Sequence, residues 1–128
     1  MVKCDREGPM YHIENDSTGV RTMPAYHDGE GVMRTRGFFD EVSRLPIKFQ
    51  MWELDPGVSE GGHVHEGDDA LEEVYYFLSG RGTMWADGED FPVTAGDAVM
   101  VPPGSDHGFR NTGTKPLKLV IIWGKPAA

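Results

Sequence analysis

Short hydrophobic runs, each interrupted by glycine or proline, follow one another along most of this chain. The runs are rich in Val, Ile, Phe, Tyr, Trp and Thr, which favour strands. No window longer than about ten residues keeps a helical period without a glycine or proline. The pattern predicts strands over 47–54, 63–66, 73–78, 83–86, 91–93, 98–101, 107–111 and 117–123. Many short strands at close spacing predict an all-β sandwich or barrel.

The first 46 residues are less regular than the rest. Residues 11–14 and 31–36 are candidate edge strands, and residues 36–45 fit either a short helix ending before Pro46 or a loop. No internal repeat or linker divides the chain. We therefore expect one domain, with an N-terminal extension over residues 1–46 and a barrel over residues 47–128.

Composition and charge narrow the functional classes. Hydrophobic residues make up 38% of the 128 residues, which is enough for one core. The net charge of −9, from 12 basic and 21 acidic residues, argues against nucleic acid and anionic membranes as partners. No apolar run approaches the roughly 18 residues of a membrane span, and no signal peptide is predicted, so a cytoplasmic location is expected. Cys4 is the single cysteine, so no internal disulfide can form.

The candidate chemistry lies in three histidines and one glutamate. His63 and His65 are two residues apart, so on a strand their side chains point to the same face and can bind one metal ion. A carboxylate from Glu73 and a third imidazole from His107 would complete a four-ligand set. Such a set suits Fe, Mn, Ni, Cu, Co or Zn. In an octahedral ion it leaves two positions for a substrate, or for a substrate and dioxygen.

The spacing of these residues resembles the cupin superfamily, which carries two motifs. The first has Gly, His-x-His, Glu and Gly at fixed spacing, and the second has Gly, Pro-x-Gly, His and Asn. The matching residues are Gly57, His63, His65, Glu73, Gly80, Gly96, Pro102, Gly104, His107 and Asn111. The second motif matches at every spacing, whereas seven residues separate His65 from Glu73 in place of three or four.

The resemblance covers residues 47–123 and implies a double-stranded β-helix, or jelly-roll barrel, with a metal in its mouth. It also implies a homodimer, the state in which such proteins often occur. The superfamily includes dioxygenases, decarboxylases, isomerases, lyases, storage proteins and sugar-sensing domains. The motifs therefore predict the fold and the metal site, but they do not fix the reaction.

The longer loop after His65 raises the question of which glutamate is the ligand. Glu73 keeps the six-residue spacing to Gly80, and Glu72 does not. Because neighbouring residues on a strand face opposite ways, only one of the two points inward. We expect that one to be Glu73, and we expect the acidic residues of the loop to be solvated.

Several other side chains share the predicted inward faces. Tyr75 and Phe77 alternate with Glu73, and Phe109 shares a face with His107, so we expect the phenylalanines to pack the barrel. Tyr75 is a candidate catalytic residue, because a buried hydroxyl needs a partner and can orient a ligand or give a proton to substrate.

The remaining candidates are interpreted more simply. Arg34 and Arg36 are expected at the surface, although either could clamp a substrate carboxylate if the extension covers the barrel mouth. His12 and His27 lack ligand-like spacing and are taken as surface or packing residues. Trp52 is the tryptophan expected to reach the pocket.

The sequence thus predicts a metal-dependent cupin enzyme that acts on a small organic molecule. A dioxygenase is the first expectation, because the ligand set leaves room for substrate and oxygen together. An isomerase or lyase is the alternative within enzymes. A ligand-binding or storage cupin without turnover is the alternative of a different class.

Overall fold

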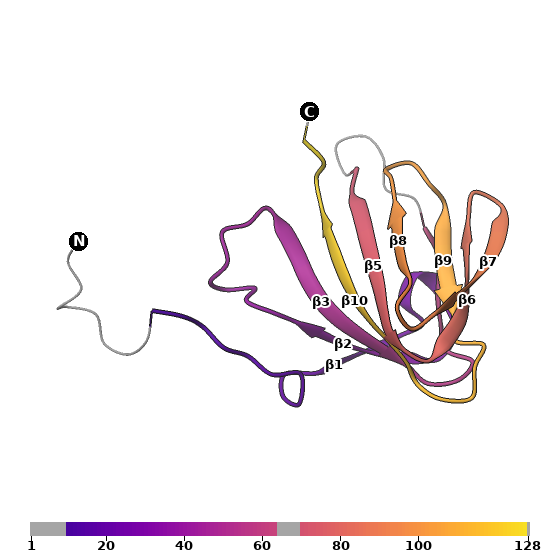
Figure 1. Cartoon of the computed structure of the whole chain (residues 1–128), viewed down its shortest axis with the longest axis horizontal. Coiled ribbons are helices and arrows are strands. Elements are labelled where there is room, and N and C mark those ends of the chain that lie inside the picture. Colours follow the sequence, from indigo (N-terminus) through magenta and orange to yellow (C-terminus); the bar gives the residue numbers. More distant parts are fainter. Residues whose placement is uncertain (1–9, 64–69, 128) are drawn as a thin grey trace.

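The chain folds into two antiparallel sheets that pack face to face (Figure 1). The computed structural model describes residues 10–63 and 70–127, with His63 described through its backbone alone. One sheet has six strands in the order β1-β2-β3-β10-β5-β8, and the other has four in the order β4-β9-β6-β7. The predicted all-β jelly-roll architecture is confirmed.

Ten strands and one short 3₁₀ turn make up the described fold. They are β1 (Arg21–Pro24), η1 (Tyr26–Asp28), β2 (Val32–Gly37), β3 (Ile47–Leu54), β4 (Ser59–His63), β5 (Glu72–Ser79), β6 (Arg81–Ala86), β7 (Glu89–Thr94), β8 (Ala98–Val101), β9 (His107–Arg110) and β10 (Leu117–Gly124). Within the described ranges, no helix is long and apolar enough to cross a membrane.

Most predicted strands are present with small changes at their ends. β3 and β8 have the predicted bounds, and β4 begins four residues earlier than predicted, while residues 64–66 lie outside the described part of the chain. Asp87 and Gly88, both with positive φ, form the predicted hairpin turn between β6 and β7.

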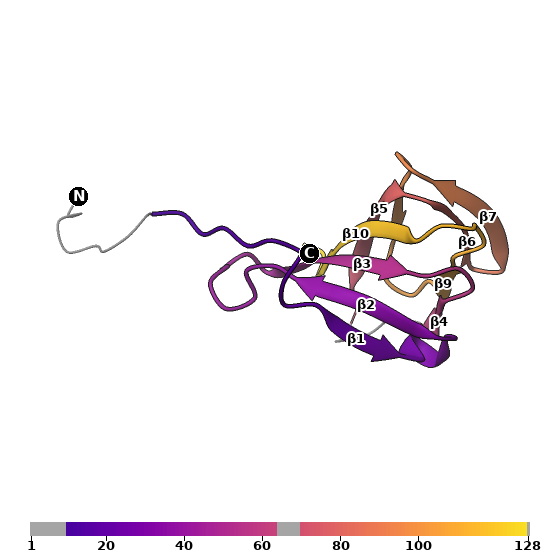
Figure 2. The same ribbon diagram turned by 90° about the horizontal axis from the view of Figure 1, so that it is seen from below.

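The N-terminal extension agrees with the sequence interpretation only in part. The candidate strand over residues 31–36 is present as β2, whereas residues 11–14 form no strand. Residues 38–46 form a loop between β2 and β3, which is the second of the two alternatives predicted for residues 36–45. The strand β1 was missed because Arg21–Pro24 has no apolar alternation, and only its pairing with β2 makes it a strand. Figure 2 shows β1 and β2 extending the six-stranded sheet beyond β3.

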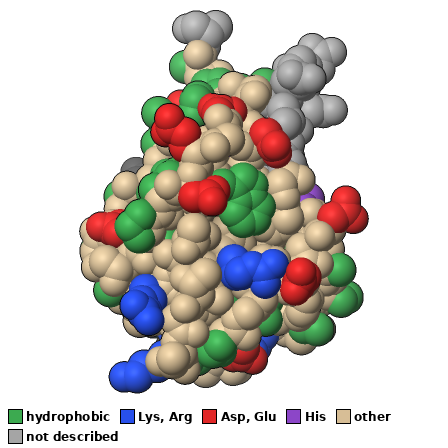
Figure 3. Space-filling view, turned by 90° about the vertical axis from the view of Figure 1, so that its right-hand side faces the viewer, with side chains coloured by type: hydrophobic (Ala, Val, Ile, Leu, Met, Phe, Trp, Pro, Cys, Tyr) green, Lys and Arg blue, Asp and Glu red, His purple; other side chains and the backbone are tan. Residues whose placement is uncertain are grey.

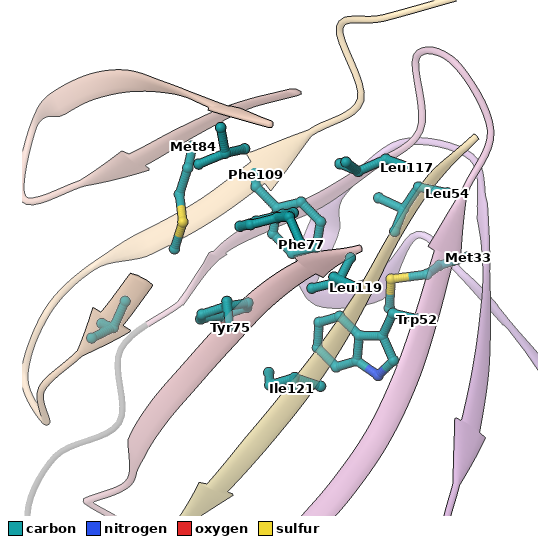
Figure 4. Close-up of a cluster of buried hydrophobic side chains, with 12 residues drawn as sticks. Met33, Trp52, Leu54, Tyr75, Phe77, Met84, Phe109, Leu117, Leu119 and Ile121 are labelled. Carbon is teal, nitrogen blue, oxygen red and sulfur yellow. The ribbon is translucent and has the colours of Figure 1, made fainter. Parts of the chain in front are cut away.

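The core lies between the two sheets and combines aliphatic and Met side chains with the aromatic rings of Trp52, Tyr75, Phe77 and Phe109 (Figure 4). Alternation along β5 buries Glu73, Tyr75 and Phe77 and leaves the residues between them exposed. Phe77 meets Phe109 of the other sheet edge to face at 6.1 Å, and Trp52 stacks on Phe109 at 6.1 Å. The phenylalanines therefore pack the barrel, as the alternation predicted.

Asn111 closes the turn that follows β9. Its amide nitrogen donates to the carbonyl oxygens of Leu54 and Lys115 at 2.9 and 2.8 Å, and its oxygen accepts from the Gly113 amide at 2.9 Å. The side chain is 1% exposed. The predicted role, a hydrogen bond to backbone near a turn, is confirmed.

We expect Asn111→Ala to lower the free energy of unfolding by about 1–3 kcal/mol, because buried backbone groups lose their partners. Urea unfolding followed by tryptophan fluorescence measures this. The matched control is Asn15→Ala, which removes an exposed asparagine whose oxygen accepts one hydrogen bond from Ser17. Equal destabilisation by both substitutions would contradict the role given to Asn111.

Candidate metal site and its pocket

Glu73 and His107 face each other inside the barrel. Glu73 lies on β5 and is 4% exposed, and His107 lies on β9 and is 2% exposed. His107 Nε2 is 3.3 Å from Glu73 Oε2. Glu72, by contrast, is only partly buried. The structure therefore confirms that Glu73 is the inward glutamate and brings two of the predicted ligands together.

The His107 ring is oriented by a backbone contact. Nδ1 lies 2.9 Å from the Ser105 carbonyl oxygen, which can only accept, so Nδ1 carries the proton and Nε2 points to Glu73. Burial alone would lower the pKa of His107. The hydrogen bonds to Glu73 and Ser105, with the negative charges of Glu73 and Glu60, outweigh burial and raise that pKa.

The two side chains fit a shared metal ion. Two ligand atoms about 2.1 Å from one ion, at tetrahedral or octahedral angles, are about 3.0–3.4 Å apart, and the 3.3 Å between His107 and Glu73 lies within that range. A histidine held through Nδ1 by a carbonyl, with Nε2 toward the site, is the usual arrangement for a metal ligand. A nitrogen and an oxygen donor suit a divalent transition metal.

The other two predicted ligands lie at the boundary of what the structure describes. The backbone of His63 pairs with His107 across the β4–β9 ladder, whereas the His63 side chain and all of His65 lie outside the described residues. In the described part of the chain, no group of three or more His, Cys, Asp or Glu side chains that could hold a metal is found. The full ligand set therefore stays a prediction.

Tyr75 lies beside Glu73 on the same face of β5. Its hydroxyl donates to Glu73 Oε2 at 2.5 Å, and its side chain is fully buried. Burial, followed by the charges of Glu60 and Glu73, raises the pKa of Tyr75 well above its usual value, so the hydroxyl stays protonated. This geometry fits a residue that orients the Glu73 carboxylate.

A small cavity opens onto Glu73. Its volume is about 70 Å³, which at the roughly 30 Å³ that a water molecule occupies in the liquid is room for about two waters. The described residues that line it are Tyr26, His27, Trp52, Glu60, Leu71, Glu73, Ile121 and Trp123. Trp52 thus reaches the pocket, as the sequence predicted. The lining is mostly apolar and aromatic, with two carboxylates and one imidazole.

The sequence interpretation missed Glu60. This carboxylate is fully buried on β4. It pairs with Phe109 in the ladder, while His63, three residues later, pairs with His107. On a regular strand, two positions three apart face opposite sides of the sheet. A one-residue irregularity lies between Glu60 and His63, so both of these positions pair with inward-facing residues. Simple alternation could not have found Glu60.

His27, predicted to be a surface or packing residue, packs on Tyr26 and also lines the cavity, which the sequence did not indicate. Its Nδ1 donates to Glu60 Oε2 at 3.1 Å, and the ring lines the cavity with Glu73. Burial lowers the pKa of His27 and raises that of Tyr26, whose pKa the charges of Glu60 and Glu73 raise further. Both residues arrive through β1 and η1, whose position no local pattern reveals.

The two arginines lie away from the cavity. Arg34 binds Glu53 and Asp55, with nitrogen–oxygen distances of 2.9 and 3.0 Å. The Arg34 guanidinium lowers the pKa of Asp55 by hydrogen bonding. Arg36 pairs with Glu14 at 3.2 Å. Arg34 is partly exposed, whereas the Arg36 side chain is only 14% exposed, so the expected surface placement is wrong for Arg36. Neither arginine lines the cavity.

A larger hollow, an apolar groove of about 600 Å³, lies at the end of β3 and β10, beneath the loop over residues 38–46. Phe38, Phe49 and Ile122 are among its lining residues, and it shares Leu71 and Trp123 with the small cavity. Glu73 lines the small cavity and does not line this groove, so we place the candidate chemistry in the small cavity.

Comparisons with known proteins agree with this geometry. The oxalate-binding protein of Thermotoga maritima is 38% identical over 74 residues, which are 58% of this chain and 59% of that protein. Acireductone dioxygenase of Rhodopseudomonas palustris is 33% identical over 81 residues, which span 60% of this chain and 41% of the dioxygenase. The chain thus matches about half the length of these curated relatives.

A crystal structure described as a predicted oxalate decarboxylase from Thermotoga maritima superposes with a TM-score of 0.82 at 27% identity, covering 90% of this chain and all of that one. The protein-family model described as the cupin domain matches residues 50–123, from the middle of β3 to the end of β10. That span is more than half of the chain and contains Glu73, His107 and strands of both sheets, so this protein belongs to the cupin family.

Proposed function

We propose that this protein holds one divalent transition metal through His63, His65, Glu73 and His107 and binds a small carboxylic acid beside it. The observation that carries the proposal is the buried contact between His107 and Glu73, of which Glu73 also lines a cavity of about 70 Å³. Cupins commonly bind a metal, and the buried imidazole and carboxylate are donors of the right kind.

The size and walls of the cavity support a small ligand. A cavity of about 70 Å³ suits a small acid better than a sugar or an aromatic substrate. The similarity to an oxalate-binding protein supports the same class of ligand. We take oxalate as the probe, because its two carboxylates can occupy two neighbouring metal positions.

When bound, the metal would act as a Lewis acid that polarises the ligand's oxygens. The chain's own residues prepare the site for it. Ser105 fixes the His107 ring, and Tyr75 donates to the Glu73 oxygen nearest that ring. Trp52 and Trp123 form aromatic walls of the cavity.

Oxidation of a small acid or enediol by dioxygen is the reaction that we propose first. The expected ligand set would leave room for substrate and dioxygen, and the similarity to acireductone dioxygenase supports this reaction class. A lyase or isomerase reaction without oxygen is the enzymatic alternative. Binding of the acid without turnover, as the name of the oxalate-binding relative suggests, is the non-enzymatic one.

His107→Ala is expected to reduce bound metal at least tenfold, because the ion loses a buried ligand. Elemental analysis of purified and metal-reconstituted protein measures the loss. The control is His12→Ala, which removes an exposed histidine that precedes the first strand. Wild-type protein that takes up no metal, or an H107A variant that retains it fully, would contradict the proposed site.

The reaction class follows from three measurements on metal-loaded wild-type protein. We expect oxalate to bind with a measurable heat in calorimetry, and oxygen consumption with a suitable small acid or enediol to indicate a dioxygenase. Product formed in anaerobic buffer would instead indicate a lyase or isomerase. Binding with no product from any tested acid would favour the binding protein.

We also propose that two copies of the chain form a homodimer through the outer face of β5 and β8. Val74, Tyr76, Leu78 and Met100 on this face are 37, 44, 44 and 56% exposed. An antiparallel sheet normally presents polar residues to water on its outer face, so an apolar outer face indicates a partner. Seen from the side of β6 and β7, hydrophobic side chains are instead interspersed with charged ones (Figure 3).

A second copy is the partner that this surface fits best. The apolar face continues along the ladder from Val74 to Ile122, which lines the groove beneath the loop over residues 38–46. That loop carries Val42 and Leu45, which are 45 and 67% exposed. In a two-fold pair, each copy can offer its loop and its face to the other, so both apolar surfaces are covered at once.

Tyr76→Glu is expected to convert the dimer into a monomer, because it places a charge in the centre of the apolar face. Light scattering after size-exclusion chromatography gives the mass in solution. Thr114→Glu, at an exposed position in the loop before β10, is the control and should remain dimeric. A monomeric wild-type protein, or a dimer that survives the Tyr76 substitution, would overturn the interface.

A further inference from the structure

The apolar groove at the end of β3 and β10 has the size of a small-molecule binding site. Its volume is about 600 Å³, and ligand pockets in proteins commonly measure about 300–1,000 Å³. The cavity beside Glu73, at about 70 Å³, lies well below that range. The proposed metal chemistry uses the small cavity and leaves the groove without a function.

The walls of the groove are aromatic and aliphatic. The loop over residues 38–46 and the facing ends of β3 and β10 supply most of them, including Phe38, Phe39, Leu45, Phe49, Ile122 and Trp123. Phe49 pairs with Ile122 across the β3–β10 ladder, and the Phe38 ring lies 5.1 Å from the Phe49 ring. Such walls suit a ligand with an apolar body, because the contact removes apolar surface of both partners from water.

Two lysines give the lining a positive charge. Lys48 and Lys125 line the groove, and Asp40 is the one acidic residue among the described residues that do so. Asp40 lies 4.0 Å from Lys48 Nζ, and both side chains are about half exposed, so this ion pair is weak in water. On a chain with a net charge of −9, a groove with excess positive charge favours an anionic head group.

The loop that covers the groove is fixed by its own contacts. The Phe38 amide donates to the Phe49 carbonyl oxygen at 2.9 Å, and the Phe39 amide donates to Glu14 Oε1 at 3.1 Å. Phe39 has a φ of 58°, in the left-handed region that residues with a Cβ rarely adopt. Such residues persist only where the surrounding structure imposes the conformation, and they occur often at ligand sites. The groove is therefore formed before any ligand binds.

We infer that this groove is a second binding site, which takes a carboxylic acid with an apolar body. The body lies against the aromatic walls, and the carboxylate lies toward Lys48 and Lys125. The lysine stems can cover part of the apolar wall while their ammonium groups stay in water at its edge. This site goes beyond the proposed function, because it needs no metal, although Leu71 and Trp123 line both hollows.

The first test measures the contribution of charge. Decanoate and decanol, which share an apolar chain and differ in the anionic head, are titrated into metal-free protein by calorimetry. We expect Lys48→Gln/Lys125→Gln to lower the affinity ratio of decanoate to decanol at least threefold. The control is Lys115→Gln/Lys118→Gln, which removes the same two charges at positions that do not line the groove, and it should keep the wild-type ratio.

The second test measures the contribution of the aromatic wall. Phe39→Asn removes one ring and keeps the backbone, because asparagine adopts the left-handed conformation more readily than other residues with a Cβ. We expect this variant to weaken the binding of both decanoate and decanol at least threefold. Val42→Asn is the control, because Val42 lies in the same loop, is 45% exposed and does not line the groove.

Tryptophan signals locate the ligand. Trp123 lines the groove, whereas Trp85 on β6 lines neither hollow. In ¹H–¹⁵N NMR spectra, assigned by replacing each tryptophan with phenylalanine, decanoate should shift the Trp123 indole signal and leave the Trp85 signal in place. 2-Naphthoate, an acid with an aromatic body, is titrated in parallel. The acid that binds more tightly shows whether the groove prefers an acyl chain or a ring.

The outcomes that overturn the inference are distinct. Wild-type protein that binds neither acid overturns the site, and an unchanged affinity ratio in Lys48→Gln/Lys125→Gln overturns its preference for an anion. Equal shifts of Trp85 and Trp123 overturn its location. Decanoate binding that appears only in the monomeric Tyr76→Glu variant shows that a second copy fills the groove and overturns the ligand site.

The groove and the metal site fail independently. We expect metal-free and Mn²⁺-loaded protein to bind decanoate with equal affinity. Protein that binds decanoate but takes up no metal would overturn the proposed function and support the groove. Protein that binds Mn²⁺ and oxalate but neither apolar acid would leave the proposed function standing and overturn the groove. Decanoate binding that requires Mn²⁺ would overturn a site separate from the metal.

Discussion

The structure depends on burying a charged glutamate and a histidine in an aromatic core. Glu73 and His107 are nearly inaccessible to water, and a buried carboxylate is costly unless hydrogen bonds and opposite charge compensate it. Tyr75 and His107 supply that compensation, and Ser105 holds the histidine in turn. A metal ion bound at this point would compensate the buried negative charge most strongly, so the same atoms would contribute both to stability and to metal binding.

The two sheets contribute unequally to this arrangement. Glu73 and Tyr75 come from β5 in the six-stranded sheet, and His107 comes from β9 in the four-stranded sheet. The Glu73–His107 contact therefore exists only when the sheets pack face to face. The stacked rings of Trp52 and Phe109 hold the sheets at that separation. Loosening of the packing between the sheets would therefore move Glu73 and His107 apart.

The N-terminal extension completes the pocket. The barrel strands supply Glu73, Trp52 and Ile121, but the wall formed by Tyr26 and His27 comes from the turn between β1 and β2. The backbone of this turn packs against the backbone of β4. Substitutions in the turn would therefore alter the shape of the pocket while Glu73 and His107 stay the same.

The sequence by itself determined the barrel strands, the inward face of β5 and the family. These features rest on local rules, because alternation fixes which side chains of a strand face the core and the turn glycines fix where strands end. Glu73, Tyr75, Phe77 and Phe109 therefore lie where the alternation predicted. His63 and His65 rest on their spacing alone, since their side chains lie outside the described residues.

Only the tertiary structure decided the roles of β1, His27 and Glu60. β1 has no pattern of its own and is a strand because β2 pairs with it. Glu60 faces inward because an irregularity in β4 breaks the alternation, and His27 reaches the cavity because the turn packs on Gly61. Each of these depends on contacts between segments far apart in the chain, and such contacts leave no periodic signal in either segment.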